Sequence, residues 1–477
     1  MFHEGLLLFL LFVIGWLVFL WILKKAGKLE SAEEPTAPKG GPEIRPGVRE
    51  EPRGSGFALS GPFLMWKTRR GRRLLDRLAQ RRRFWRLFGD ASVAIVFLAM
   101  VSMTALLVWL AALVVNIPSG REPAPQQLLG LPGVNPLIPL WYGILGLAVA
   151  IIVHEFCHGI LARVSKIRVN SLGLLFFIVP IGAFVEPDEA EMKAMPRRER
   201  ARLYAVGPAV NIVLALLFAI LFSVGFMGSV SPAANGAPIA GVVANSPAAD
   251  AGIQPGTILL AVDGTEAHSY GDFAGLMANT TAGQNVTLTL FRKSNGTYEQ
   301  VVQLADAFNF TGNDSRRGDG FLGVSPCLSG NLCMNRITTA YFHPIGGAGE
   351  FGGFLQSSLA YISLPLAGLQ PMQGVAAEFY VIDGPLAGLG EGAFWTLANL
   401  MYWLFWLNLM LGMTNALPAV PLDGGYIFRD AIHAIMATFR SGMAVERREK
   451  IARNVSYAFA LMILVLIVWQ LVGPRLL

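Results

Sequence analysis

The stretch His154-Glu155-Phe156-Cys157-His158 places two imidazoles four residues apart, with a carboxylate beside the first. On a helix, this spacing puts both imidazoles on one face, one turn apart. Zinc binds imidazole nitrogen readily, and in hydrolytic sites it keeps one position open for a water molecule, whose pKa falls toward about 7. A neighbouring carboxylate can then take a proton from that water. We therefore predict a zinc site with His154 and His158 as ligands and Glu155 as general base.

The setting of this motif supports the prediction. Residues 143–153, which run directly into it, carry no charge. Polar and ionisable side chains in a membrane-spanning helix cost several kcal/mol, so they are rarely present without a function. The competing interpretation is a pair of core histidines with ordinary hydrogen-bond partners, and the apolar setting favours the metal site over it.

A third protein ligand is needed, because hydrolytic zinc sites have three protein ligands and one open position. The candidate is Asp423, which follows a Pro-rich stretch from Asn415 through Pro418 to Pro421 and precedes two glycines. The order of membrane spans brings it to the depth of His154. An ordinary turn is one competing interpretation. Another is a zinc protease of a different type, in which a glutamate on a later helix is the third ligand.

The composition indicates a membrane protein: of 477 residues, 53% are hydrophobic and only 15% are charged. We predict about six membrane-spanning helices from the long uncharged runs at 5–23, 91–115, 140–153 continuing through the metal motif, 203–227, 394–413 and 456–472. A further apolar region, 351–371, has no clear class.

The basic residues are unevenly placed, and they predict the orientation of the spans. Lys24, Lys25 and Lys28 follow the first run directly, so its C-terminal end is expected in the cytoplasm, as a retained anchor rather than a cleaved signal. Residues 67–86 carry ten Lys and Arg between large apolar residues, a pattern that suits the anionic inner leaflet. Binding to the lipid bilayer explains these charges, and we expect no nucleic-acid partner.

Residues 171–185 are apolar but too short to span a membrane as a helix, and they contain Gly173, Pro180 and Gly182. Irregular or extended backbone at membrane depth is tolerated where other protein covers it. We predict a re-entrant hairpin beside the metal, whose exposed edge could pair with an unwound substrate segment. A plain buried loop is the competing interpretation.

A soluble module is expected at about 229–304. Residues 245–264 are typical of a capped helix, a turn, a strand and an Asp-Gly turn, and 286–291 alternate as a strand does. The stretch resembles a PDZ domain in circularly permuted form, with a peptide-binding loop near 236–241. The span order places it outside the cytoplasm. Five glycosylation-type triplets, and nine acidic against five basic residues over 228–350, favour the same side.

The predicted fold is a polytopic α-helical membrane protein with an inserted extracytoplasmic α/β PDZ-like domain. Its expected parts are an N-terminal transmembrane anchor (1–28), a basic cytoplasmic linker, flexible over 29–60, with an amphipathic segment (29–90), the first part of the membrane core (91–227), the PDZ-like domain (228–305), an extracytoplasmic connector (306–392), and the second part of the core with the last span (393–477).

Three separated motifs occur here in the order typical of one family: the histidine pair with Glu155, the Gly182-Ala-Phe-Val-Glu-Pro-Asp188 stretch with Gly207-Pro208 and Asn211, and the Asn415 to Asp423 segment. With the PDZ-like insert, they resemble the site-two protease family of intramembrane zinc metalloproteases. The resemblance covers about 140–425. It implies Zn2+ bound by His154, His158 and Asp423, with Glu155 as the base.

The resemblance also implies a function and a place of action. The substrates would be single-span membrane proteins already shortened by another protease, cut within their transmembrane segments near the cytoplasmic face of the cell membrane. Asn415 would position the unwound substrate, and we expect Asn211, Pro418 and Gly182 to contribute to its binding. The glycosylation triplets and the lack of a bacterial-type signal favour an archaeal membrane.

Two other functions compete with this one. A catalytically inactive PDZ-bearing membrane scaffold or adaptor would need a degraded metal motif, which the sequence does not show. A zinc transporter would need ligands along a path, and the remaining histidines form no trail through the spans. Of the cysteines, Cys157 is expected to pack away from the metal, while Cys327 and Cys333 would pair in an oxidising compartment.

Overall fold

The computed structural model describes residues 56–60, 63–68, 71–114, 132–177, 179–327, 374–440 and 442–476, with short pieces at 15–16, 18–23, 25, 30–31, 126, 130, 358, 361–363 and 365. The chain forms two compact units. The first, called the helical unit, consists of Met1–Pro132, Gly143–Ala215 and Trp406–Leu477. The second, called the strand-rich unit, consists of Gly133–Tyr142 and Leu216–Phe405.

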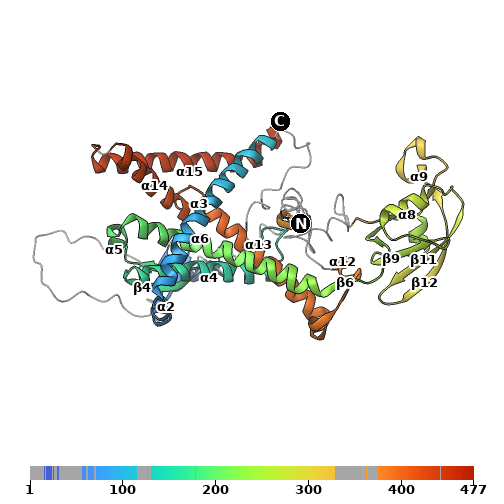
Figure 1. Ribbon diagram of the computed structural model, residues 1–477, viewed down its shortest axis with the longest axis horizontal. Coiled ribbons are helices and arrows are strands. Elements are labelled where there is room, and N and C mark those ends of the chain that lie inside the picture. Colours follow the sequence, from blue (N-terminus) through green and yellow to red (C-terminus); the bar gives the residue numbers. More distant parts are fainter. Residues whose placement is uncertain are drawn as a thin grey trace, which may run out of the picture. The chain divides into compact units, whose positions relative to one another are not determined.

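Among the described residues, five helices are long and apolar enough to cross a membrane, so the chain is a multi-pass membrane protein. They are α3 (Arg82–Leu113), α4 (Leu140–Val164), α6 (Arg197–Ile220) with its continuation to Ser229, α13 (Glu391–Asn415) and α15 (Val445–Leu476) (Figure 1). They match five of the six predicted runs. The sixth, 5–23, lies mostly outside the described residues, as does the apolar region 351–371.

Helix α4 ends sharply just after the metal motif. Lys166 takes a left-handed conformation with φ of 67°. The Ile167 N–H donates to the Ala162 carbonyl at 2.8 Å, and the Lys166 N–H donates to the Arg163 carbonyl at 3.1 Å. These two bonds form a Schellman motif, which satisfies carbonyl groups at the helix end. The chain can therefore turn at once into a strand that lies close to α4.

Residues 171–185 form a hairpin, as predicted, while its re-entrant position in the membrane stays a prediction. Strands β4 (Val169–Phe177) and β5 (Val179–Pro187) pair antiparallel directly after α4. Gly173 on β4 is required by close packing, because a Cβ there would collide with the Trp66 carbonyl oxygen and lie 2.5 Å from the Phe184 ring. Residues 171–185, whose glycines and proline disfavour a helix, therefore form strands instead.

Three earlier strands extend this hairpin: β1 (Glu30–Ser31), β2 (Gly56–Ser60) and β3 (Phe63–Thr68). The sheet order is β1-β2-β3-β4-β5, and β3 pairs antiparallel with β4. The prediction of a flexible linker over 29–60 therefore does not hold for residues 30–31 and 56–60. The outer edge of β4 carries backbone donors and acceptors that need partners, and β3 supplies them. Strand β5 is the edge strand on the other side of the sheet.

The short helix α2 (Arg72–Ala79) is fixed against α4. Leu75 is fully buried, and a Cβ added at Gly159 would lie 3.0–3.2 Å from its methyl carbons. Arg163 Nε donates to Asp76 Oδ1 at 2.6 Å. Since Gly159 directly follows a predicted metal ligand, α2 helps to hold the part of α4 that carries the motif.

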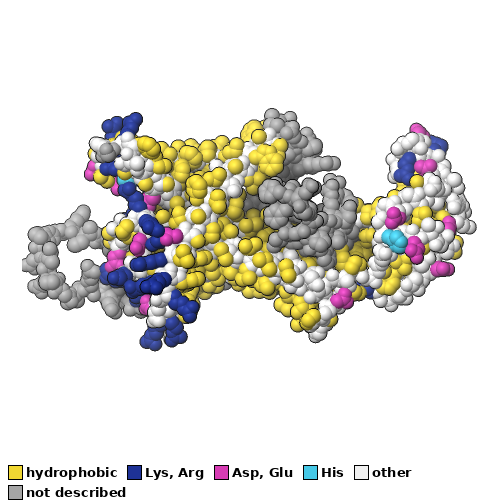
Figure 2. Space-filling view, viewed as in Figure 1, with side chains coloured by type: hydrophobic (Ala, Val, Ile, Leu, Met, Phe, Trp, Pro, Cys, Tyr) yellow, Lys and Arg dark blue, Asp and Glu magenta, His cyan; other side chains and the backbone are white. Residues whose placement is uncertain are grey.

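Charged side chains gather at one end of the helical unit, over α2, α5 (Glu189–Ala194) and the start of α15, while hydrophobic side chains cover the helices beyond it (Figure 2). At this end Arg200 on α6 donates twice to Asp430 on α14 (Asp423–Phe439), from Nε at 2.6 Å and from Nη2 at 2.8 Å. This bidentate pair ties α14 to α6. It fixes the helix whose first residue is the third predicted ligand.

The strand-rich unit contains one larger sheet. Its order is β10 (Thr265–Glu266), β9 (Thr257–Val262), β11 (Asn285–Arg292) and β12 (Gly296–Gln303), with β7 (Ala237–Ile239) also paired to β9. Val286, Leu288 and Leu290 alternate along β11 and are fully buried in the core under the sheet.

The local predictions for this stretch are confirmed. Helix α7 (Pro247–Asp250) is capped by Ser246, β9 follows a turn, and Asp263-Gly264 leads into β10. A second short helix, α8 (Tyr270–Met277), precedes β11. Further strand pairs are β6 (Val230–Pro232) with β16 (Tyr380–Ile382), β8 (Gly241–Val242) with β15 (Val324–Ser325), and β13 (Ala305–Asp306) with β14 (Gly320–Phe321). The likeness to a PDZ domain stays a prediction.

Leu75 and Leu74 provide a matched test of the docking of α2. Leu75→Ala should lower the free energy of unfolding by about 2–5 kcal/mol, because it leaves a cavity against α4. Leu74→Ala should change it by less than about 0.5 kcal/mol, because Leu74 is 49% exposed. Thermal or denaturant unfolding of the purified protein measures both variants. Equal effects of the two substitutions would contradict the docking of α2 on α4.

Candidate metal centre

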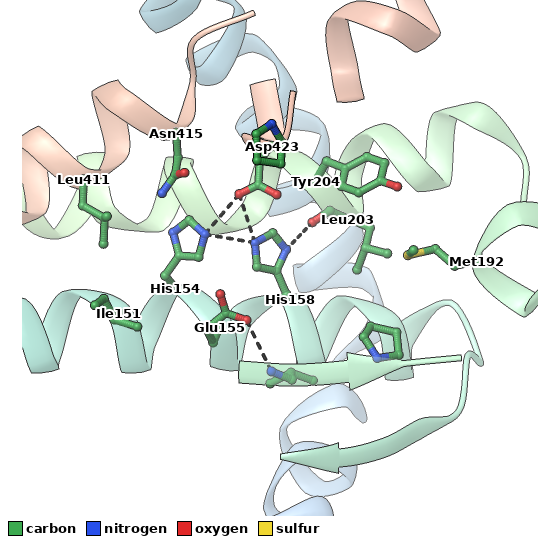
Figure 3. Close-up of a pocket in the computed structure, with 13 residues that line it drawn as sticks. Ile151, His154, Glu155, His158, Met192, Leu203, Tyr204, Leu411, Asn415 and Asp423 are labelled. Carbon is green, nitrogen blue, oxygen red and sulfur yellow. Dashed lines mark hydrogen bonds and ion pairs between the residues drawn. The ribbon is translucent and has the colours of Figure 1, made fainter. Parts of the chain in front are cut away.

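The helical unit brings together side chains that are 269 positions apart in the sequence. Helix α4 supplies His154, Glu155 and His158, and the N-terminus of α14 supplies Asp423 (Figure 3). The chain between α13 and α14 is short and Pro-rich, so Asp423 follows closely after Asn415 at the end of α13. The carboxylate of Asp423 points at the two imidazoles (Figure 3).

The three predicted ligands have the separations that one zinc ion requires. His154 Nε2 lies 3.1 Å from Asp423 Oδ2 and 3.1 Å from His158 Nε2. His158 Nε2 lies 3.4 Å from the same carboxylate oxygen. Atoms that bind one zinc tetrahedrally at about 2.0–2.1 Å lie about 3.4 Å apart. Both the donor types and their spacing therefore fit zinc.

The orientation of His158 is set by helix α6. Its Nδ1 lies 2.7 Å from the Leu203 carbonyl oxygen, which can only accept, so Nδ1 carries the proton. The lone pair of the neutral ring is then on Nε2, which faces the other two ligand atoms. Such a hydrogen bond to the second ring nitrogen is the usual way in which proteins orient a metal-binding histidine.

Gly207 on α6 lets this helix approach the imidazoles. A Cβ at this position would lie 2.6 Å from His154 Nε2 and closer still to His158 Nε2. Any larger side chain would therefore occupy the space at the ligand atoms. The sequence showed Gly207 in a motif, but only the packing of α6 on α4 shows why it must be glycine.

Glu155 lies beside the imidazoles and is tied to the hairpin. Its Oε2 accepts a hydrogen bond from the Val185 N–H of β5 at 3.3 Å (Figure 3). The hairpin therefore holds the carboxylate that would act as base. Cys157 on the same helix is buried in a hydrophobic cluster and free, as expected for a packing residue. Cys327 is disulfide-bonded, and Cys333 lies outside the described residues.

These residues line a cavity of about 400 Å³. Its walls come from α4, β5, α5, α6, α13 and the start of α14: Ile151, His154, Glu155, His158, Val185, Pro187, Met192, Leu203, Tyr204, Leu411, Asn415, Pro421 and Asp423.

The four predicted substrate-binding residues are placed differently from one another. Asn415 lines the cavity, whereas Asn211, Pro418 and Gly182 are not among its lining residues. Asn211 is fully buried, and within the described part of the chain neither its Oδ1 nor its Nδ2 has a hydrogen-bond partner. Gly182 lies on β5. Sequence reasoning gave no role to Leu203 or Tyr204, since a backbone carbonyl and a ring at a helix start carry no distinctive pattern.

The chain is similar to known proteins over most of its length. The profile of peptidase family M50 matches residues 142–463, which include all three candidate ligands and Glu155. An uncharacterized protein of Methanocaldococcus jannaschii is 22% identical over 369 residues, 77% of each chain. A protein of Rhizobium meliloti is 24% identical over 373 residues, 68% of this chain and 93% of its own. The zinc metalloprotease RasP of Shouchella clausii is 25% identical over 309 residues, 61% of this chain and 63% of its own.

The packing of Gly207 predicts a specific loss of metal. In Gly207→Ala, the new methyl group would overlap the Nε2 atoms of the imidazoles, so zinc content should fall by at least about tenfold. Gly225→Ala is the control, because a Cβ at Gly225 meets no atom within 4 Å. Elemental analysis of the purified variants measures zinc, and circular dichroism checks the helix content. Full zinc in Gly207→Ala would contradict the proposed ligand geometry.

Proposed function

Because the chain belongs to peptidase family M50, the site-two protease family, and is a zinc metalloprotease, we propose that it cleaves peptide bonds within transmembrane segments of other membrane proteins. One observation carries this proposal. Two imidazoles on α4, a helix that is long and apolar enough to cross a membrane, converge with a carboxylate from the start of α14. A hydrolytic site built there is suited to substrates that lie in the bilayer.

The chemistry divides between the metal and Glu155. Zinc, when bound by His154, His158 and Asp423, supplies a Lewis acid that polarises the scissile carbonyl and lowers the pKa of water. Glu155 takes a proton from the attacking water and passes it to the leaving amine. The Val185 N–H holds the Glu155 carboxylate on the hairpin side of the cavity during both transfers.

The substrate segment must be extended to present one peptide bond, because a helix hides its backbone groups in its own hydrogen bonds. Strand β5 ends the sheet order, while β3 occupies the other edge of the hairpin. We therefore assign the edge of β5, which includes Gly182, as the place where the unwound segment pairs. This edge leads to Val185 and Glu155 at the cavity wall.

Asn415 lies in the cavity wall at the end of α13, where its amide can donate a hydrogen bond to the substrate backbone. Neither Asn211 nor Pro418 lines this cavity. Their proposed contribution is indirect, through the packing of α6 and of the segment before Asp423.

We further propose that the module at 228–305 is PDZ-like, lies outside the cytoplasm and admits chains whose outer domain another protease has already removed. Its support is the acidic surplus over 228–350 and the glycosylation-type triplets there. The basic end of the helical unit would face the cytoplasm. The active site then lies in the membrane near the cytoplasmic face. A catalytically inactive scaffold, the competing function, would not need His154, His158 and Asp423 to converge as they do.

Glu155→Gln separates the base from the metal. The amide cannot accept the proton from water, so cleavage of a single-span test substrate should fall by about 10²–10⁴-fold. Zinc content should stay at the wild-type level, because Glu155 is not among the three ligands. Glu446→Gln serves as the control, since this exposed glutamate lies at the start of α15, outside the cavity. Normal cleavage by Glu155→Gln would remove the proposed base.

A further inference from the structure

A second cavity, of about 610 Å³, lies in the helical unit between α5, α6, α14 and α15. It adjoins the catalytic cavity, because Met192 and Tyr204 line both. The ring of Tyr204 stacks on Tyr426 of α14, with centroids 5.0 Å apart and an angle of 17° between the planes. This cavity, called the charged vestibule, therefore lies directly beside the catalytic cavity.

Its lining carries more positive than negative charge. Five basic and three acidic residues contribute to its walls. Two of the basic residues are neutralised within the cavity. Arg200 makes the bidentate pair with Asp430 at 2.6 and 2.8 Å, and Lys193 pairs with Glu189 at 2.9 Å. Three guanidinium groups remain against one carboxylate, that of Glu449.

The three remaining guanidinium groups, those of Arg197, Arg429 and Arg453, have no carboxylate within 4.0 Å in the described part of the chain. Arg429 lies over the Tyr426 ring, 5.3 Å from its centroid. Arg197 lies 3.2 Å from His433 Nε2, an arrangement in which the guanidinium donates to a neutral imidazole. Burial, together with Arg197, holds the pKa of His433 below its usual value, which keeps this imidazole neutral.

His433 gives the vestibule one buried polar wall residue, while Arg197 and Arg453 are exposed at its rim. His433 is only 6% exposed, and its Nδ1 is buried without a hydrogen-bond partner among the described residues. The guanidinium groups that lack carboxylates indicate a site for an acceptor-rich, negatively charged ligand.

We propose that the charged vestibule binds an acidic segment of the substrate that flanks the scissile bond. This inference rests on the proposed function, since it makes the vestibule a specificity subsite of the same protease. Proximity to the catalytic cavity favours a peptide over a lipid headgroup, because the two cavities share the wall residues Met192 and Tyr204 and the flank of a bound substrate would lie nearby. Aspartate and glutamate side chains would pair with Arg429 and Arg453, and the backbone would reach the Tyr204–Tyr426 stack.

The test compares two single-span substrates that are identical except for one cytoplasmic flank, which carries aspartate and glutamate in one and asparagine and glutamine in the other. Wild-type protein in zwitterionic vesicles should prefer the acidic substrate in kcat/KM, mainly through a lower KM. In Arg429→Gln/Arg453→Gln the acidic-to-neutral ratio should fall about fivefold to tenfold. Arg440→Gln/Arg447→Gln, two exposed arginines outside the vestibule, should keep the wild-type ratio.

A binding measurement separates this inference from the proposed function. Fluorescence anisotropy follows the soluble acidic flank peptide and its amide counterpart on the full-length protein. Tighter binding of the acidic peptide, lost in Arg429→Gln/Arg453→Gln, supports the vestibule. Equal binding or equal cleavage of the acidic and the amide peptides would overturn the inference. Binding of the vestibule to anionic lipid alone would also overturn it, because the ligand would then be a lipid headgroup. If wild-type protein binds the peptide but cleaves neither substrate, the proposed function fails and the subsite stands.

Discussion

The structure depends on the meeting of three ligand atoms from two distant parts of the chain inside an apolar helical unit. His154 and His158 are one turn apart on α4, and Asp423 arrives at the start of α14. Without a cation, a half-buried carboxylate 3.1 Å and 3.4 Å from the two imidazole nitrogens would need protons to stabilise it. A zinc ion bound there would satisfy all three atoms at once, and the surrounding elements hold these atoms in place.

Helix α6 is the main support of this arrangement. It accepts the hydrogen bond of His158 at the Leu203 carbonyl, and it brings Gly207 against the ligand nitrogens. Nearer the N-terminus of the same helix, Arg200 forms an ion pair with Asp430 and so anchors α14. One helix thus orients a ligand of α4 and also anchors the helix that carries the third ligand. Its first two turns, from Arg197 to Tyr204, also line the charged vestibule, and Tyr204 lies in the wall of both cavities.

Much of the site could be predicted from the sequence, because the residue types carry the chemistry. The spacing of His154 and His158 fixes a shared helix face, and the glycines and proline of 171–185 exclude a long helix. The strands β1–β3 could not be predicted, since β1 and β2 lie in a segment of linker-like composition and the pairing of β3 with β4 is a long-range contact. Leu203 contributes only a backbone carbonyl, and the vestibule arises from four helices, so neither leaves a local pattern in the sequence.

The most direct test of the account asks whether residue 423 touches the metal. In Asp423→Cys the longer zinc–sulfur bond offsets the shorter side chain, so a thiolate can take the place of the carboxylate. X-ray absorption at the zinc edge of the wild-type protein should show nitrogen and oxygen ligands at about 2.0–2.1 Å and no sulfur. The variant should add one sulfur at about 2.3 Å. A zinc-loaded variant without that sulfur would contradict the central claim, because Asp423 would then not reach the ion held by His154 and His158.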